Sequence, residues 1–273
     1  MISPRLSYRG FIFDLDGTVY LGERVLPGAR EVIATLRAEG RRVGFLSNKP
    51  IQSRADYAAK LTRLGIPADV DQVINSSYVL AQHLAREAPG ARCFVIGEAP
   101  LIAELRAAGL APVDDARVDY VVVAFDRTFD YRKLDMALQA VTRYGARLVG
   151  TNPDRTCPVE GGEIPDAAGM IGAVEGVTGR RVDPVVGKPS PITLRVALDQ
   201  LGLPPADCAI VGDRLETDMA MGRAAGLGTI LVLTGVTRPE DPAIAEWRPT
   251  HVVGSLAELL TEGAPPEVAR GAR

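Results

Sequence analysis

Short apolar runs alternate with amphipathic segments along almost the whole chain, and this alternation is the feature that most restricts the fold. Residues 9–13 and 42–47 have the composition of buried strands, whereas 28–39 and 52–65 carry apolar residues at helical spacing. Strands that alternate with helices form βαβ units, which pair into a parallel sheet with helices on its faces. The sequence therefore predicts an α/β fold built on a parallel sheet.

The middle of the chain repeats this pattern, which indicates a second α/β domain inserted into the first. Strand-like and helical segments alternate again between residues 93 and 150, and the first pattern resumes near residue 182. We expect a discontinuous core domain formed by residues 1–80 and 182–262, with residues 81–181 as the inserted domain. Residues 263–273 are rich in Pro, Gly and Ala without periodicity, and we expect them to form a mobile tail.

The composition is typical of a globular protein of the cell interior. The 273 residues are 47% hydrophobic, so the chain can bury a sizeable core. A net charge of −3 lacks the basic excess that marks nucleic-acid binding. Three widely spaced cysteines give no disulfide framework, and no segment has the length and hydropathy of a signal peptide or membrane span. We therefore expect a cytoplasmic protein with no nucleic-acid or membrane partner.

Four groups of polar residues stand where apolar runs end. Three of the groups follow predicted strands, and each group precedes a predicted helix. Each group by itself also fits a turn, a helix cap or a solvated surface, but ligands of open parallel sheets bind at the carboxyl ends of the strands, where helix N-termini favour phosphate. Their joint occurrence therefore favours a phosphate site. The groups are Asp14 with Asp16, Ser47 with Asn48, Lys188, and Asp213 with Asp218.

These residue types suit the transfer of a phosphoryl group. Asp14 and Asp213 can share a divalent cation with the backbone carbonyl of Asp16, and Mg²⁺ prefers such oxygen ligands. The cation also neutralises phosphate, so Asp14 can attack phosphorus as a nucleophile. Asp16 can protonate the leaving group and later deprotonate the hydrolytic water. Lys188 and the Ser47 hydroxyl can hold the phosphoryl oxygens.

At these residues the chain resembles the haloacid dehalogenase superfamily of phosphatases. The DLDGT run, the strand-final Ser47, Lys188 and the GDRLETD run match the four motifs of that family in order and spacing. The resemblance implies a Rossmann-like core and Mg²⁺-dependent hydrolysis of phosphate monoesters through an aspartyl-phosphate. It gives the five residues of the preceding paragraph the roles stated there. Asp218 is expected to anchor a metal-bound water or Lys188.

The inserted segment resembles the large α/β cap, of type C2, of the nitrophenylphosphatase-like or NagD-type branch. That branch also carries the run TNPD, present here at 151–154. The cap is expected to select the substrate, with Asn152, Arg155 and Phe125 facing it, and Asn48 is expected to bind substrate beside Ser47 and Lys188. Packing is the alternative reading of Phe125, and simple solvation that of Arg155. The resemblance also implies a homodimer through the cap.

Two other functions use the same groups. A phosphotransferase or mutase shares the covalent intermediate, but it needs water excluded and a second phosphate site. A phospho-accepting regulator without turnover shares the acidic pair, the hydroxyl and the lysine, but receiver domains are short and accept phosphate on a middle strand. A dehalogenase lacks the second aspartate that Asp16 supplies. The expected substrates are small phosphate esters: sugar phosphates, phosphoglycolate, glycerol phosphate, nucleoside monophosphates, pyridoxal phosphate or nitrophenyl phosphate.

Overall fold

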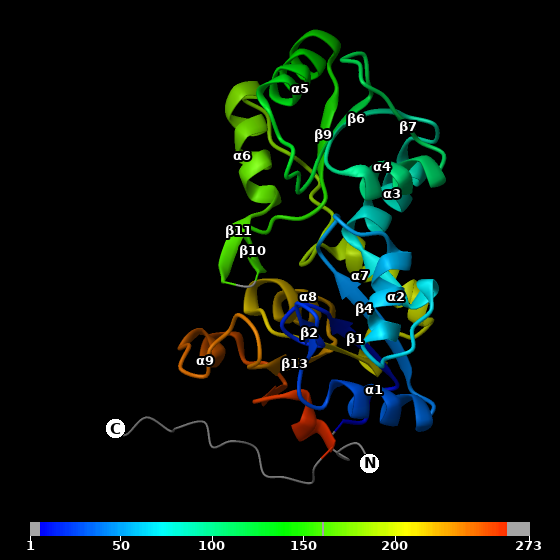
Figure 1. Cartoon of the computed structure of the whole chain (residues 1–273), viewed down its shortest axis with the longest axis vertical. Coiled ribbons are helices and arrows are strands. Elements are labelled where there is room, and N and C mark those ends of the chain that lie inside the picture. The colour runs from blue at the N-terminus through cyan, green and yellow to red at the C-terminus, as the bar shows by residue number, and fades with distance from the viewer. Residues whose placement is uncertain (1–5, 160, 261–273) are drawn as a thin grey trace. The chain divides into compact units, whose positions relative to one another are not determined.

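The computed structural model describes residues 6–159 and 161–260, which form two compact units joined by several chain crossings (Figure 1). The first unit lies within Met1–Leu46, Ala58–Gln72 and Ala197–Arg273, and the second within Ser47–Tyr57 and Val73–Val196.

The boundaries of these units fall at other residues than the boundaries of the expected domains. Residues 47–57, 73–80 and 182–196, which the sequence analysis assigns to the core domain, cluster with the inserted segment. The domain boundaries near residues 80 and 181 therefore stay a prediction. The expected tail at 263–273 lies outside the described residues.

The first unit is built on a parallel sheet, in which its strands are adjacent in the order β14-β13-β12-β1-β4. Every residue of β1, β12 and β13 is buried, as expected for parallel strands that are covered on both faces. The predicted α/β class with a Rossmann-like parallel sheet is thereby confirmed. The strand bounds are β1 Gly10–Asp14, β4 Arg42–Ser47, β12 Cys208–Gly212, β13 Gly228–Val232 and β14 His251–Val253.

The helices that lie wholly within the first unit are short, and α1 is amphipathic. The helix α1 (Ala29–Ala38) buries Ala29, Val32, Ile33 and Leu36, whose spacing places them on one face. It starts after Gly28, where an added Cβ would lie 2.1 Å from the backbone nitrogen of Ala257, so only glycine fits there. The other elements are the hairpin β2 (Tyr20–Leu21) and β3 (Arg24–Val25), α8 (Ala220–Ala225), α9 (Ala243–Trp247), a π-helix at Leu215–Met219 and 3₁₀ turns at Val70–Gln72, Pro205–Asp207 and Leu256–Leu260.

The second unit contains a parallel sheet of its own, with strand order β7-β6-β8-β9. Its apolar core includes Phe94, Val121 and Phe125, against which residues of α5 and α6 pack. The strands are β5 Val73–Asn75, β6 Arg92–Ile96, β7 Ala111–Pro112, β8 Tyr120–Val123, β9 Arg147–Gly150, and the antiparallel pair β10 Thr156–Val159 and β11 Gly162–Pro165. The helices are α3 Ser76–Glu87, α4 Ala99–Ala107, α5 Tyr131–Tyr144 and α6 Ala167–Thr178, while α2 (Arg54–Arg63) and α7 (Pro191–Leu201) each belong partly to both units.

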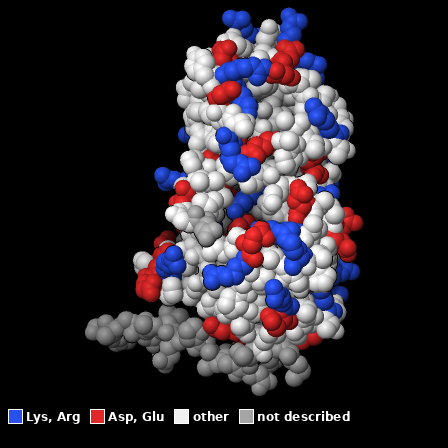
Figure 2. Space-filling model, in the orientation of Figure 1, with Lys and Arg blue, Asp and Glu red and all other residues white. Residues whose placement is uncertain are grey.

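Acidic and basic side chains are interspersed over the described residues on the face shown in Figure 2. Exposed ion pairs include Arg63 with Glu23 at 2.7 Å and Arg92 with Asp115 at 3.0 Å. Exposed pairs of this kind contribute about 1 kcal/mol or less each, so the fold depends on its apolar cores.

Candidate active site

The chain turns sharply directly after β1, where the first two candidate aspartates lie. Gly17 has a φ of +89°, which glycine adopts without strain. Its amide donates to the carbonyl of Tyr20 at 2.8 Å, and its carbonyl accepts from the Thr234 hydroxyl at 2.6 Å. Asp14 is the last residue of β1 and so lies just before this turn, at the edge at which the sequence predicts a site.

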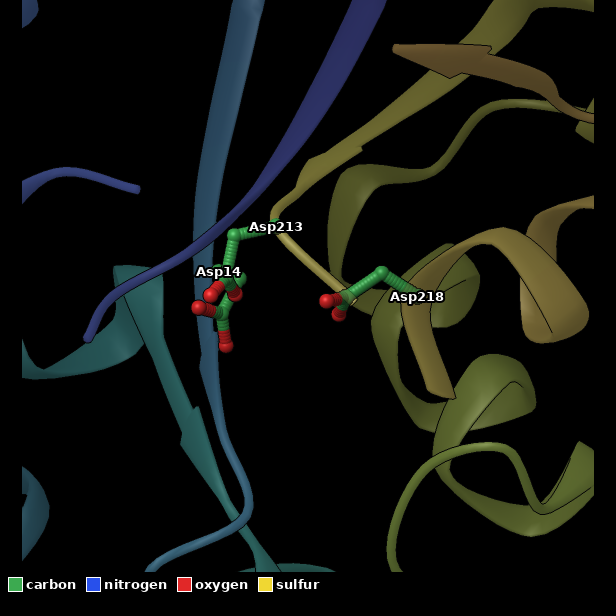
Figure 3. Close-up of side chains that lie close together, drawn as sticks. All are labelled: Asp14, Asp213 and Asp218. Carbon is green, nitrogen blue, oxygen red and sulfur yellow. The ribbon is translucent and has the colours of Figure 1, made fainter. Parts of the chain in front are cut away.

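Three buried carboxylates come together at this edge of the first unit. One oxygen each of Asp14, Asp213 and Asp218 lies within 4.8 Å of the other two (Figure 3). Asp14 is 9% exposed, whereas Asp213 and Asp218 are 1% and 0% exposed. Buried carboxylates at such distances repel one another unless a cation or protons neutralise them. Their oxygens are also the ligands that Mg²⁺ prefers, so the group fits a magnesium ion.

Three glycines enclose this acidic cluster so closely that none could carry a side chain. A Cβ at Gly235 would lie 1.9 Å from Asp213 Oδ2, and one at Gly17 would lie 2.6 Å from the same atom. A Cβ at Gly212 would lie 2.3 Å from the carboxyl carbon of Asp218. The backbone at two loop positions and at the end of β12 therefore packs directly against the carboxylates of Asp213 and Asp218. The sequence by itself gave no sign of a role for Gly235.

Backbone amides fix the orientation of two of the carboxylates. The Val236 amide donates to Asp213 Oδ2 at 2.6 Å, and the Arg214 amide donates to Asp218 Oδ2 at 3.2 Å. Asp218 belongs to the π-helix, in which the Met219 amide donates to the carbonyl of Arg214 at 3.2 Å. Single π-helical turns are frequent at functional sites, and this one brings Asp218 to the cluster.

The candidate aspartates thus do not all contribute their carboxylates to this cluster. Among the described residues, the clustered carboxylates are Asp14, Asp213 and Asp218, and the group does not include the carboxylate of Asp16. The sequence analysis expects Asp16 to use its carbonyl as a ligand and its side chain as an acid and base. Those roles stay predictions, as does the role of Asp218 in anchoring a water or Lys188.

Ser47, Asn48 and Lys188 belong to the second unit. Ser47 ends β4 and is 3% exposed. Its Oγ accepts from the Lys49 amide at 3.2 Å and lies 3.4 Å from the Tyr57 hydroxyl, which in turn donates to the carbonyl of Lys49 at 3.3 Å. These contacts hold the hydroxyl in one place at the end of the strand.

The side chain of Asn48 binds the main chain of Lys188. Its Oδ1 accepts from the Lys188 amide at 2.8 Å, and its Nδ2 donates to the Lys188 carbonyl at 3.3 Å. Lys188 is itself only 3% exposed. The expectation that Asn48 binds substrate stays a prediction, because the described contacts use its amide to hold the lysine.

The three cap residues that the sequence singles out differ in exposure. Asn152 is fully buried, Phe125 is 1% exposed within the apolar core of the second unit, and Arg155 is exposed. Their contacts with substrate stay predictions.

Asn152 donates from Nδ2 to Asp166 Oδ1 at 2.9 Å, a contact that the sequence did not signal. Burial raises the pKa of Asp166, and the negative charge of Asp154 adds to this rise, while hydrogen bonds from Asn152 and the Ala167 amide oppose it. Asp166 precedes α6 and accepts from the Ala167 amide, so its N-cap position was the one available clue.

Comparison with known proteins identifies the family. Residues 11–111 match the model of the haloacid dehalogenase-like hydrolases, and residues 185–259 match a second, HAD-hydrolase-like model. The chain is 38% identical over 255 residues to the sugar-phosphatase AraL of Bacillus subtilis, covering 93% of each chain. The structure of p-nitrophenyl phosphatase from Archaeoglobus fulgidus has a TM-score of 0.87 and 39% identity, over 93% of this chain and 98% of that one.

A further solved structure bears on the metal. The glycerol phosphate phosphatase Rv1692 of Mycobacterium tuberculosis, in complex with magnesium, has a TM-score of 0.85 and 35% identity, over 95% of this chain and 78% of that one. The chain belongs to the haloacid dehalogenase-like hydrolases, in the nitrophenylphosphatase-like, NagD-type branch. It is a phosphoric monoester hydrolase of that family, whose phosphatases use Mg²⁺. None of the helices in the described parts of the chain is both long enough and apolar enough to span a membrane.

Proposed function

We propose that this protein hydrolyses small phosphate monoesters of the sugar phosphate and glycerol phosphate class through an aspartyl-phosphate formed on Asp14. The observation that carries the proposal is the buried cluster of Asp14, Asp213 and Asp218 at the end of β1. Relatives named for sugar phosphate, glycerol phosphate and nitrophenyl phosphate support the substrate class.

Mg²⁺ would be held by Asp14, Asp213 and the carbonyl of Asp16, with Asp218 beside them. When bound, it neutralises the charge that carboxylates and phosphate accumulate in one place. Gly17, Gly212 and Gly235, here called the glycine cradle, pack against Asp213 and Asp218 and restrict these two carboxylates, which suits a preformed ligand set.

The chemistry then runs in two steps on the residues of the chain. A carboxylate oxygen of Asp14 attacks phosphorus, the bond to the ester oxygen breaks, and Asp16 gives that oxygen a proton. Water next attacks the phosphorus of the aspartyl-phosphate and loses a proton to Asp16, which restores Asp14 and releases inorganic phosphate. Ser47 and Lys188 bind phosphoryl oxygens in both steps.

The test is phosphate release from a panel of esters by wild type and by the variant Asp14→Asn. We expect wild type to release inorganic phosphate with Mg²⁺ present and to lose activity when Mg²⁺ is chelated. The variant should keep the fold and lose turnover, because an amide is a very weak nucleophile. Normal turnover by Asp14→Asn would contradict the nucleophile, and phosphorylated product without free phosphate would show a phosphotransferase instead.

The proposal includes a cytoplasmic location and a homodimer through the inserted domain. A reducing compartment is supported by the cysteines, since Cys93, Cys157 and Cys208 are buried and form no disulfide with one another. The dimer rests on the family resemblance, and light scattering after size-exclusion chromatography would decide it.

A further inference from the structure

The main chain of Lys188 is held by one side chain from a distant part of the sequence. The amide of Asn48 accepts from the nitrogen and donates to the carbonyl of Lys188, at 2.8 Å and 3.3 Å. The two residues are 140 positions apart. This two-point contact sets the position and the direction of the lysine's backbone, from which its ammonium group is projected.

A carboxylate decides which way the Asn48 amide points. Asp154 Oδ2 accepts from Asn48 Nδ2 at 2.8 Å. If the amide were reversed, its oxygen would face both the carboxylate of Asp154 and the carbonyl of Lys188, and all three are acceptors. The negative charge of Asp154 therefore favours the one orientation in which Oδ1 faces the Lys188 amide.

Asp154 is in turn held from its other side. The same Oδ2 accepts from Asn152 Nδ2 at 2.9 Å, and Asn152 is fully buried. Asn152 also donates to Asp166, which is 2% exposed, and accepts from the Thr151 hydroxyl at 2.8 Å. Networks of this kind restrict the motion of their members, and this one, in which Asp154 is half-buried, links the N-cap of α6 to the Asn48 amide.

The backbone next to Lys188 packs against the same network. The Gly187 amide donates to the carbonyl of Thr151 at 2.6 Å. A Cβ at Gly187 would lie 2.9 Å from Asn48 Oδ1 and 3.0 Å from the Cα of Asn152. The segment before the lysine thus has little freedom to adjust if the network changes.

We propose that Asp154 is a positioning residue of this phosphatase, acting through Asn48 on Lys188. The inference rests on the proposed function, because it takes Lys188 as a ligand of the phosphoryl group. Asp154 orients the Asn48 amide, and the amide fixes the backbone of the lysine. A displacement of the order of 1 Å in a group that binds the reacting atoms costs about 10²-fold in rate, so loss of this orientation should be visible in turnover.

The first measurement compares Asp154→Ala with Asp154→Asn. The alanine variant removes the carboxylate acceptor of Asn48 Nδ2 and leaves it the longer bond to the Lys188 carbonyl, and we expect kcat/KM for nitrophenyl phosphate to fall by about 10- to 100-fold. The asparagine variant keeps an acceptor oxygen, so it should remain within about fivefold of wild type. Equal losses in the two variants would overturn the proposal.

A matched control removes an aspartate of the same unit that does not belong to the network. Asp130 is exposed and caps α5 by accepting from the Lys133 amide at 2.8 Å. Asp130→Ala should lower the melting temperature, because a lost N-cap costs about 1 kcal/mol, and it should leave kcat/KM unchanged. This separates lost stability from lost positioning.

The deciding experiment is a double-mutant cycle with Lys188→Ala. If Asp154 acts through Lys188, adding Asp154→Ala to Lys188→Ala should lower the remaining activity by less than twofold. If Asp154→Ala lowered the activity of wild type and of Lys188→Ala by the same factor, its role would be merely structural and the inference would be overturned. If Asp154→Ala does not fold, Asn48→Ala takes its place in the cycle with Lys188→Ala, and additive losses there would likewise overturn the inference.

The outcomes keep the two proposals apart. Turnover retained by Asp14→Asn overturns the proposed function, and with it this inference. An inactive Asp14→Asn together with additive losses in the cycle overturns the inference alone.

Discussion

A single methyl group at Gly235 tests whether the glycine cradle holds the acidic cluster in place. The Cβ of Gly235→Ala would lie 1.9 Å from Asp213 Oδ2 and 2.5 Å from its carboxyl carbon. The clash falls on a carboxylate that the Val236 amide holds at 2.6 Å, so either the loop or the carboxylate must move.

The size of the effect follows from these distances. Ordinary contact begins near 3.4 Å, so Asp213 Oδ2 and the new methyl group must separate by about 1.5 Å. A displacement of that size removes the hydrogen bond from Val236, which costs about 1.5–3 kcal/mol for a charged acceptor. Misplacement by about 1 Å near the reacting groups costs about 10²-fold in rate. We therefore expect Gly235→Ala to lose at least about 100-fold in kcat/KM.

The assay is phosphate release as a function of Mg²⁺ concentration, together with thermal unfolding. Gly235→Ala should need at least about tenfold more Mg²⁺ for half of its maximal rate, because one ligand is displaced.

Two control variants share the change from glycine to alanine. A Cβ at Gly222 would lie 2.5 Å from Ile210 Cγ2, an apolar clash expected to cost about 1–3 kcal/mol of stability without altering the Mg²⁺ dependence. A Cβ at Gly172, within α6, meets nothing within 4 Å, so Gly172→Ala should stabilise the protein by about 0.5–1 kcal/mol. If Gly235→Ala kept the Mg²⁺ dependence and rate of wild type, the cradle would have no role in ordering the cluster.

Three further predictions follow from the remaining candidate residues. Asp16→Asn should keep Mg²⁺ binding and lose about 10² to 10⁴ in rate, with a smaller loss for nitrophenyl phosphate, whose leaving group needs no proton; an equal loss for all esters would contradict its role as an acid. Arg155→Ala should change the ratio of kcat/KM between esters by about tenfold or more, near 1.4 kcal/mol, which a substrate panel would check. Phe125→Ala should lower the free energy of unfolding by about 3–5 kcal/mol because that ring is buried, which urea titration would check. Because the pKa of Asp166 is raised by folding, the native state holds its proton longer than the unfolded chain, and the contribution of Asp166 to stability should fall as the pH rises from about 3.8 through the raised value. Asp166→Asn lacks this titration, so its stability relative to wild type should increase over that range in urea unfolding at a series of pH values.

Local sequence patterns were sufficient to predict the fold class and the position at which β1 ends. Apolar runs at strand length and helical spacing between them predict a parallel sheet, because each pattern depends only on neighbouring residues. The same patterns place Asp14 and Asp213 at strand ends, and the structure adds that β1 and β12 are parallel neighbours whose carboxyl ends share one edge. The four motifs, read together, were also enough to indicate the phosphatase family that the relatives confirm.

Other features of the site were decided only by the tertiary structure. The sequence shows that Asp218 follows Asp213 by five positions, but the π-helical turn determines that its carboxylate joins the cluster. Nothing near Gly235 in the sequence indicates that its Cα lies against Asp213, because that contact is made by the packing of two separate loops.

The hydrogen bonds around Lys188 are the clearest example of contacts that local sequence patterns do not predict. Asn48 and Asp154 are 106 positions apart, and Asn48 and Lys188 are 140 apart, yet each pair is joined by a hydrogen bond. Periodicity and turn chemistry describe what a residue does within its own segment. Contacts between distant segments depend on how the whole chain packs, since a side chain's partners are set by the path of the backbone that brings them within hydrogen-bond distance.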